Sequence, residues 1–306
     1  MSKRRTLNLC SMAAVVVLAL SAAACVVSVD SAVFEARDEK RFAVGGKPDL
    51  TIATFDGAID VRAWDRPEVV VEIEKRGGDK ALVDAIEVKA EQSGNRIVVE
   101  VVRPSANSDT LRIGRRAFFG YMGSSARLTV SVPRECDLTA RSGDGTITIE
   151  RVSGRLDLHS GDGNIRGSDL RGSLKAHTDD GSLRLVDIDG RADVDTGDGG
   201  IELTGTLSMV RARTGDGSVT VRAEPGSATA DAWEIRTGDG GITVEVPDTL
   251  GAELDASTGD GSVRVEGLTL AVAGERDRHS VRGTIAAGGR PLRVRTGSGT
   301  INIRRF

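Results

Sequence analysis

The sequence predicts an all-β fold: a parallel β-solenoid, or β-helix, of two-strand coils of about 18 residues, with an N-terminal β-meander or cap. Three observations support this fold class. A short phrase, Ser/Thr-Gly-Asp-Gly, returns at a fixed interval. Apolar residues alternate with polar ones on both sides of it, and 38 glycines accompany few aromatic side chains among 306 residues. A fixed interval of this length is typical of a repeat architecture.

Eight copies of the phrase define the repeat. The first five begin 18 residues apart; the third copy reads Thr-Asp-Asp-Gly and the last reads Thr-Gly-Ser-Gly. The copies begin at Ser142, Ser160, Thr178, Thr196, Thr214, Thr237, Thr258 and Thr296.

The flanks of the phrase predict two short strands per coil. The residues four and two positions before each phrase are apolar, and so are those two and four positions after its last glycine, except at Gly167. Alternation with period two means that each strand has one buried face. A second corner repeats at Gly154, Gly172, Gly190 and Gly226. We expect the glycines of both corners to supply the positive φ of tight turns.

Stacking must stabilise the coils. About five inward side chains at about 2 kcal/mol each do not offset the backbone entropy of one coil, so neighbouring coils have to share strand hydrogen bonds and a core. The longer excursion from Leu268 to Gly289 is expected to cap the open end, where a bare strand edge would favour aggregation.

We expect residues 42–129 to form an N-terminal β region and residues 130–306 to form the solenoid. An early copy of the repeat surrounds Thr54-Phe55-Asp56-Gly57, and a short helix is expected around Asp79–Ala85. The segment Pro104–Ser125 mixes arginines with aromatic residues. It either folds its aromatics over the open end of the core or forms a membrane-proximal or partner-binding loop.

The N-terminus predicts export. Residues 1–24 read as a signal peptide of the lipoprotein type: Lys3–Arg5 form a positive region, and Met12–Leu20 an apolar stretch too short to span a bilayer. A small-residue cleavage region, Ser21–Ala24, completes it, and residues 25–41 are expected to form a tether.

Cys25 is the expected anchor. Its context resembles a bacterial lipobox in which Ala22 replaces the usual Leu. We expect lipidation of Cys25 to hold the exported protein at the cell membrane or the outer-membrane surface; ordinary secretion with a free thiol is the alternative. Only Cys136 then remains in the folded domain, and it is expected to be structural rather than a nucleophile.

Several segments resemble one known family. They are the opening Leu50–Trp64, the pairs Val132-Pro133 and Val246-Pro247, the Ser/Thr-Gly-Asp-Gly series and the closing Gly288–Ile303. Together they are similar to the "putative adhesin" family of bacterial β-strand-repeat envelope proteins, a domain of unknown function. The resemblance covers about residues 42–306 and implies an exported β-solenoid without established catalytic residues.

A ladder of aspartates is the main candidate site. Stacked strands lie about 4.8 Å apart, so these charges repel one another and could attract cations such as calcium. Alternatively, each carboxylate accepts hydrogen bonds from the amides of its own turn. Because the spacing differs from that of calcium-binding nonapeptide repeats, we favour turn chemistry and expect neither a metal nor another cofactor. The ladder comprises Asp144, Asp162, Asp180, Asp198, Asp216, Asp239 and Asp260.

The outward columns before the phrase carry mixed charges, as expected for a solvated sheet face whose side chains pair across strands. His159 and His177 would be neighbours, with Asp195 one coil further, so a transition-metal site there is conceivable. It lacks a fourth ligand.

These features predict a non-enzymatic cell-envelope lipoprotein with a structural, adhesion or interaction role. No nucleophile elbow, zinc spacing or phosphate loop occurs in the sequence. A calcium-dependent binding module and a carbohydrate-active enzyme on a β-helix are the alternatives. The expected partners are the membrane and an envelope or extracellular protein or glycan. Nucleic acid is not expected, because the net charge is −4 and only two Trp and one Tyr could stack on bases.

Overall fold

The computed structural model describes residues 34–103, 124–272 and 277–306. The expected signal peptide, Cys25 and nearly all of the segment Pro104–Ser125 lie outside these residues. In the described part of the chain, no helix is long and apolar enough to cross a membrane.

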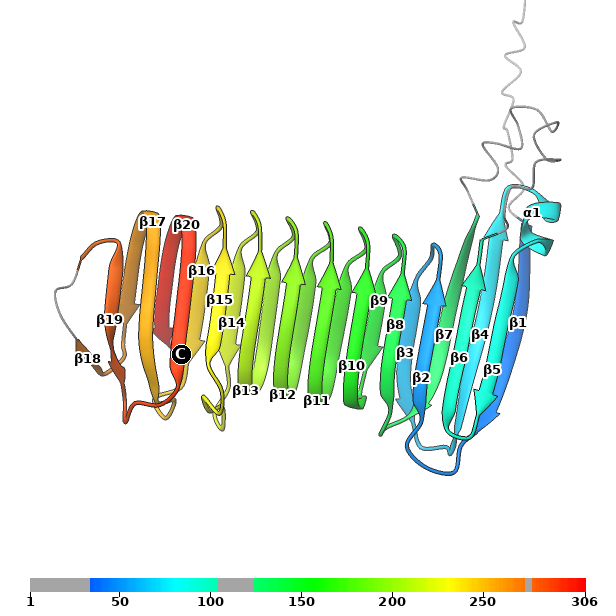
Figure 1. The fold of residues 1–306 in the computed structure, drawn as a ribbon, viewed down its shortest axis with the longest axis horizontal. Coiled ribbons are helices and arrows are strands. Elements are labelled where there is room, and N and C mark those ends of the chain that lie inside the picture. The colour runs from blue at the N-terminus through cyan, green and yellow to red at the C-terminus, as the bar shows by residue number, and fades with distance from the viewer. Residues whose placement is uncertain (1–33, 104–123, 273–276) are drawn as a thin grey trace, which may run out of the picture. The chain divides into compact units, whose positions relative to one another are not determined.

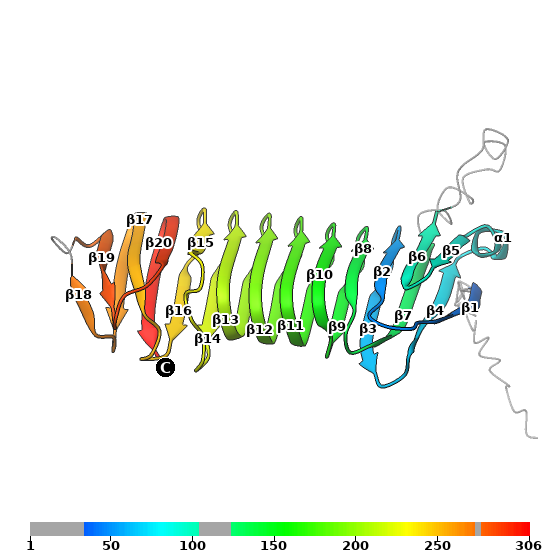
Figure 2. The same ribbon diagram turned by 60° about the horizontal axis from the view of Figure 1, so that its bottom comes forward.

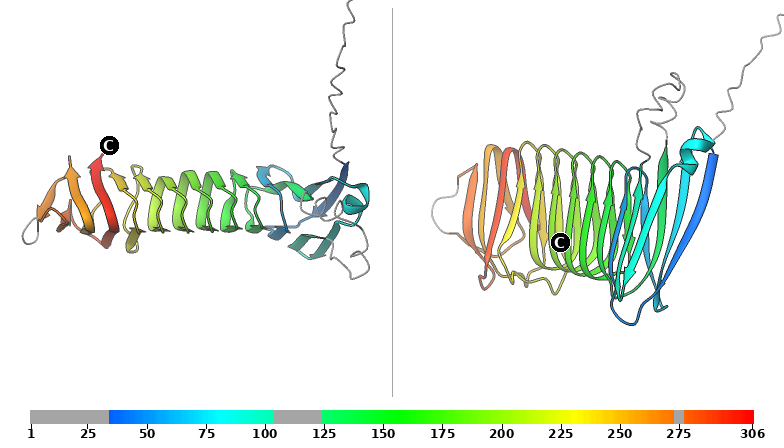
Figure 3. Two further views of the ribbon diagram at one scale, coloured as in Figure 1. Left: turned by 90° about the horizontal axis from the view of Figure 1, so that it is seen from above. Right: turned by 45° about the vertical axis from the view of Figure 1, so that its right-hand side comes forward.

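The chain folds into a stack of two-strand coils, which confirms the predicted β-solenoid (Figure 1). Each coil contributes one strand to each of two faces. Face A holds the strands that lead into the Ser/Thr-Gly-Asp-Gly corner, and face B holds the strands that leave it. Figures 2 and 3 show the same stack from other sides.

Within the repeats, neighbouring coils pair in parallel. The three longest strands of the middle coils pass through the second corner and so belong to both faces. The repeat strands are β8 (Asp137–Ser142), β9 (Ile147–Glu150), β10 (Ser153–Ser160), β11 (Ile165–Thr178), β12 (Leu183–Thr196), β13 (Ile201–Thr214), β14 (Val219–Ala223), β15 (Trp233–Thr237), β16 (Ile242–Val246), β17 (Ala252–Glu266) and β20 (Pro291–Arg305).

The core runs between the two faces, as the alternation predicted. The apolar residues on both sides of the phrase are buried, apart from the half-buried Val263 and Val265 on the last coil of face B. Gly167, the one break in the pattern, leaves a space that Leu170 and Leu185 fill. A continuous core of this kind is what makes the coils stable together but not singly.

The second corner has the expected left-handed backbone. Gly154, Gly172 and Gly190 have φ of 152°, 109° and 137°. In each of these three corners, the residue three positions earlier also has positive φ: Arg151 (62°), Asp169 (50°) and Asp187 (56°). Asp tolerates this conformation better than most residues. The prediction that glycine supplies positive φ is therefore confirmed for this corner.

The N-terminal region caps the stack. The early copy of the repeat forms a coil from β2 (Asp49–Thr54) and β3 (Ile59–Trp64), which pairs in parallel with β8 and β9 on one side and with β6 (Arg96–Val102) and β7 (Ser125–Pro133) on the other. Antiparallel strands follow outside: β5 (Glu87–Ser93) on β6, and β4 (Glu68–Gly77) on β7.

The predicted short helix is α1 (Lys80–Asp84), and Asp79 caps its N-terminus. The expected tether, by contrast, ends earlier than residue 41. Strand β1 (Phe34–Ala43) pairs antiparallel with β4 and forms the edge of face B. Five consecutive charged residues, Arg37–Arg41, lie on this strand, which is typical of an edge strand that resists further pairing.

The last coil departs from sequence order. Strand β20 lies between β16 and β17 on face B and between β15 and β17 on face A. Strand β19 (Ser280–Ile285) pairs antiparallel with the outer edge of β17, and β18 (Leu270–Val272) pairs antiparallel with β19. The expected cap at Leu268–Gly289 is thus confirmed.

Candidate functional site

The Ser/Thr of the repeated phrase is buried and joins neighbouring coils. The hydroxyl of Thr178 donates to the carbonyl oxygen of Gly163 at 2.8 Å and accepts the amide of Gly181 at 3.3 Å. The same donation recurs at each copy, at distances of 2.7 to 3.0 Å. A buried column of hydroxyls therefore satisfies corner carbonyls along the stack.

The last glycine of the phrase is required by close stacking. A Cβ at Gly199 would overlap the carbonyl oxygen of Gly181 in the preceding coil, and the same overlap recurs at Gly163 and Gly217. None of these three glycines has positive φ. Our expectation of positive φ at this corner is therefore wrong for the middle coils, where the missing side chain is what matters.

The seven ladder aspartates lie at the exposed tips of these corners. None of them accepts a hydrogen bond from its own turn; in five of the seven corners the Ser/Thr hydroxyl accepts the amide of the last glycine. The turn-chemistry explanation is thus right for the corner but assigned to the wrong side chain. Among the described residues, no group of three or more His, Cys, Asp or Glu side chains could hold a metal ion.

The ladder differs in two places from the one read in the sequence. Ser298 of the inserted coil lies between Asp239 and Asp260, so those two carboxylates are not neighbours. At the other end, Asp56 of the early copy joins the ladder beside Asp144. Burial raises the pKa of Asp56, and the charge of Asp144 raises it further, while Arg103 opposes this.

The two histidines of the outward column stack as predicted from their positions. The rings of His159 and His177 lie 5.0 Å apart between centroids, at 13°. Both ring nitrogens of His177 contact carboxylates: Nδ1 lies 3.1 Å from Asp195, and Nε2 lies 3.2 Å from Asp179. These contacts use the nitrogens that a metal would need.

Cys136 is a buried core residue. Burial raises the pKa of its thiol to about 12, so it stays protonated at neutral pH and is a poor nucleophile. This agrees with the structural role predicted from the sequence.

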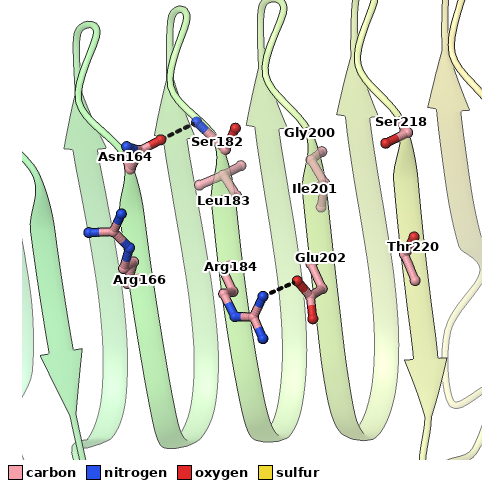
Figure 4. Close-up of a pocket in the computed structure, with 10 residues that line it drawn as sticks. All are labelled: Asn164, Arg166, Ser182, Leu183, Arg184, Gly200, Ile201, Glu202, Ser218 and Thr220. Atoms are coloured by element: carbon pink, nitrogen blue, oxygen red, sulfur yellow. Dashed lines mark hydrogen bonds and ion pairs between the residues drawn. The ribbon is translucent and has the colours of Figure 1, made fainter.

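An open polar groove lies on face B across β11 to β14 (Figure 4). It encloses about 390 Å³. Two rows of outward residues form it, one directly after the Gly-Asp-Gly corner and one two residues further along. The lining residues are Asn164, Arg166, Ser182, Leu183, Arg184, Gly200, Ile201, Glu202, Ser218 and Thr220.

The groove contains two arginines, of which Arg184 forms an ion pair with a described residue and Arg166 does not. Arg184 donates to Glu202 at 2.7 Å across neighbouring strands. Arg166 is exposed on the preceding strand, and among the described residues no carboxylate lies within ion-pair distance of it. Parallel strands about 4.8 Å apart bring its charge beside the Arg184–Glu202 pair.

The floor of the groove is open because a glycine lies in its upper row. A Cβ at Gly200 would meet no atom closer than the carbonyl oxygen of Ser218, at 3.6 Å. There is therefore room for a side chain at this position, and its absence leaves space in the groove. Around it, Asn164 accepts the amide of Ser182 at 2.9 Å, and the hydroxyls of Ser218 and Thr220 face solvent. The arrangement suits an anionic or hydroxyl-rich ligand, and it pairs no nucleophile with a base.

Sequence reasoning missed this groove. We considered the columns that precede the phrase and not those that follow it. A signal was present, since the residues one and three positions after the last glycine are small, polar or basic in four consecutive coils, apart from Glu202.

Comparisons with known proteins agree on the family. A family model described as Toastrack DUF4097 matches residues 48–304, which confirms the resemblance seen in the sequence. No curated protein sequence matches the chain.

Solved structures with a similar chain trace include a "putative adhesin" from Bacteroides fragilis NCTC 9343, 13% identical, covering 89% of this chain and 97% of that one at a TM-score of 0.41. Another is a "putative lipid binding protein" from Parabacteroides distasonis ATCC 8503, 12% identical, covering 87% and 96% at a TM-score of 0.35. Similarities this low carry no argument about function.

Proposed function

Because the chain belongs to the Toastrack DUF4097 family, we propose that it is a non-enzymatic, lipid-anchored protein of the bacterial envelope whose solenoid serves an interaction role. The observation that carries this proposal is the groove on face B. It offers a free guanidinium, a neighbouring ion pair and hydroxyls on a rigid sheet, which is a surface for contact and not an enclosed site for catalysis.

The sequence supports attachment through Cys25, which directly follows an apolar stretch and a small-residue cleavage region. Two or more acyl chains on this cysteine would give a stable anchor, since one chain binds a membrane only marginally. Expression of the full chain and of Cys25→Ala, followed by membrane fractionation, tests this step. Loss of membrane partitioning in the variant is expected. Continued partitioning would show that lipidation is not the cause.

The groove favours an acidic glycan as its contact. Arg166 can bind a carboxylate or sulfate, and hydroxyl-bearing residues on the neighbouring strands can bind sugar hydroxyls. Retention of the purified protein on immobilised acidic and neutral polysaccharides tests this. We expect selective retention on the acidic ones.

The matched variants are Arg166→Glu, in the groove, and Arg171→Glu, which changes the charge equally at the second corner. Only Arg166→Glu should reduce retention, by about tenfold if one charged contact is lost. Equal retention of both variants would rule out the groove as the contact, without bearing on the anchor.

A further inference from the structure

Strand β20 fills a gap between two coils that precede it in the chain. On one side it pairs with β15 and β16, from Trp233↔Leu292 to Val246↔Arg305. On the other side it pairs with β17 along almost its whole length. All of these pairings are parallel and keep the register of the repeat, so the two walls of the gap form one complete binding site for a coil.

The charges of β20 and of the gap are complementary. The segment Pro291–Phe306 carries four arginines and no acidic residue. One wall, Trp233–Val246, carries Glu234, Asp239 and Glu245 against one arginine; the other, Ala252–Glu266, carries four acidic residues against one arginine. The other coils carry both acidic and basic residues, so the coil formed by β20 differs from them in its charge.

Ionic contacts hold the inserted coil on both faces, and Arg305 near its end also binds Asp248 at 3.2 Å. On face A, Asp255 of β17 binds Arg295 of β20 and also Arg282 of β19 at 3.2 Å. Burial would raise the pKa of Asp255, but these two arginines outweigh it and lower the pKa. On face B, Glu245 of β16 binds Arg304, and its side chain is only 12% exposed.

The connection into β20 is short and conformationally strained. Residues 286–290 join β19 to β20, and Ala286 has φ of 50°. A residue with a Cβ is disfavoured in this left-handed region. Short hinge loops under strain favour exchange of the adjoining element between copies, because the exchanged form extends the hinge.

We propose that the gap between β16 and β17 is a strand-acceptor site that also takes the β20 segment of a second copy of this chain. Two copies then form a dimer by exchanging this coil. Every contact of β20 is kept in the exchanged form, so concentration and the relief of strain at the hinge set the balance between the two forms.

Cross-linking of two variants of the full chain, each with one added cysteine, tests the exchange. Thr243 of β16 and Asn302 of β20 are outward partners in adjacent parallel strands, at a separation that a disulfide can bridge. Thr243→Cys and Asn302→Cys protein are mixed at high concentration, warmed below the melting transition, oxidised and separated on a non-reducing gel. A disulfide between these positions forms only if β20 of one copy lies beside β16 of the other.

The control mixture is Thr243→Cys with Arg264→Cys. Arg264 faces outward on β17 and pairs with Asn302, so it is one strand too far from position 243 in both the closed and the exchanged form. The native cysteines are present in both mixtures. We expect several-fold more covalent dimer from the Thr243/Asn302 mixture, and faster formation when Asp255→Asn loosens the contact with Arg295. Equal dimer in the two mixtures would overturn the proposal.

Discussion

The hydroxyl of Thr196 donates to the carbonyl oxygen of Gly181 over 2.8 Å and accepts the amide of Gly199 over 3.3 Å. One buried side chain thus satisfies a backbone group in its own coil and one in the coil before it. Because the contact repeats along the stack, the phrase Ser/Thr-Gly-Asp-Gly is a device for joining coils. The aspartate of the phrase is exposed in each of the seven copies that have one, whereas the Ser/Thr is buried.

Removal of this hydroxyl should destabilise the solenoid. Thr196→Val keeps the shape of the side chain but leaves the carbonyl of Gly181 and the amide of Gly199 without a partner, at a cost of about 1–3 kcal/mol. Thr196→Ser keeps the hydroxyl and should cost less than about 1 kcal/mol. Urea unfolding followed by circular dichroism measures both. Equal stability of the two variants would show that the hydroxyl contributes nothing.

Two adjacent glycines should respond differently to alanine. A Cβ at Gly199 overlaps the carbonyl oxygen of Gly181, whereas a Cβ at Gly200 meets nothing closer than 3.6 Å. Gly199→Ala should therefore force the coils apart and cost about 3 kcal/mol or more, while Gly200→Ala should be close to neutral. Thermal unfolding of the pair checks this. If the two melting temperatures fall together, close stacking at the corner is not the constraint.

Asp137 should make the stability of the fold depend on pH in the acidic range. It begins β8 and binds Lys47 at 2.5 Å and Arg155 of β10 at 2.9 Å. Burial would raise the pKa of Asp137, but hydrogen bonds from Lys47 and Arg155 outweigh burial and lower the pKa to about 2. A depressed folded-state pKa means that the contribution is complete above the unfolded value of about 3.9 and is lost as the pH falls through about 2.

The variant Asp137→Asn should therefore be less stable than the native chain at pH 6, by roughly 1 kcal/mol after solvent screening. The difference in stability between the two proteins should become smaller between about pH 4 and pH 2. Asp65→Asn is the control, because the Asp65 side chain is 85% exposed and its pairing with Arg134 should contribute little. Urea unfolding at several pH values measures this difference in the free energy of unfolding. A difference that stays constant down to pH 2.5 would contradict the assignment.

The fold was predictable from the sequence because the repeat is local. The apolar alternation around each phrase fixes two strands per coil, and residues such as Leu158 and Ile165 are buried where the pattern places them. The position of β20 was not predictable from that pattern. Its phrase is equivalent to those of β15 and β17, so the repeat alone allows β20 to lie outside β17 or between β16 and β17. The ion pair of Arg304 with Glu245 of β16 is made only in the second arrangement.

The candidate site was less predictable for a related reason. The pattern locates corners and faces but not hollows, which depend on the side chains that neighbouring coils happen to place together. Gly200 opens the groove because Ser182 and Ser218 flank it on adjacent strands. The prediction that Asp stabilises the corner failed for a similar reason. The turn rules for Asp concern a single coil, whereas the Ser/Thr hydroxyl makes a contact with the preceding coil.

Calcium should not stabilise the protein through the aspartate ladder. The seven carboxylates are exposed, and each lies about one strand spacing from the next except Asp239 and Asp260, which Ser298 separates. No three metal-ligating side chains converge among the described residues. We expect the melting temperature to be the same in EGTA and in millimolar calcium, once ionic strength is matched with sodium chloride. A small rise common to both salts would reflect screening of repulsion between carboxylates. Asp180→Asn with Asp198→Asn should show the same rise or less, because it removes two neighbouring charges. A rise specific to calcium and abolished by this double variant would instead establish a calcium site.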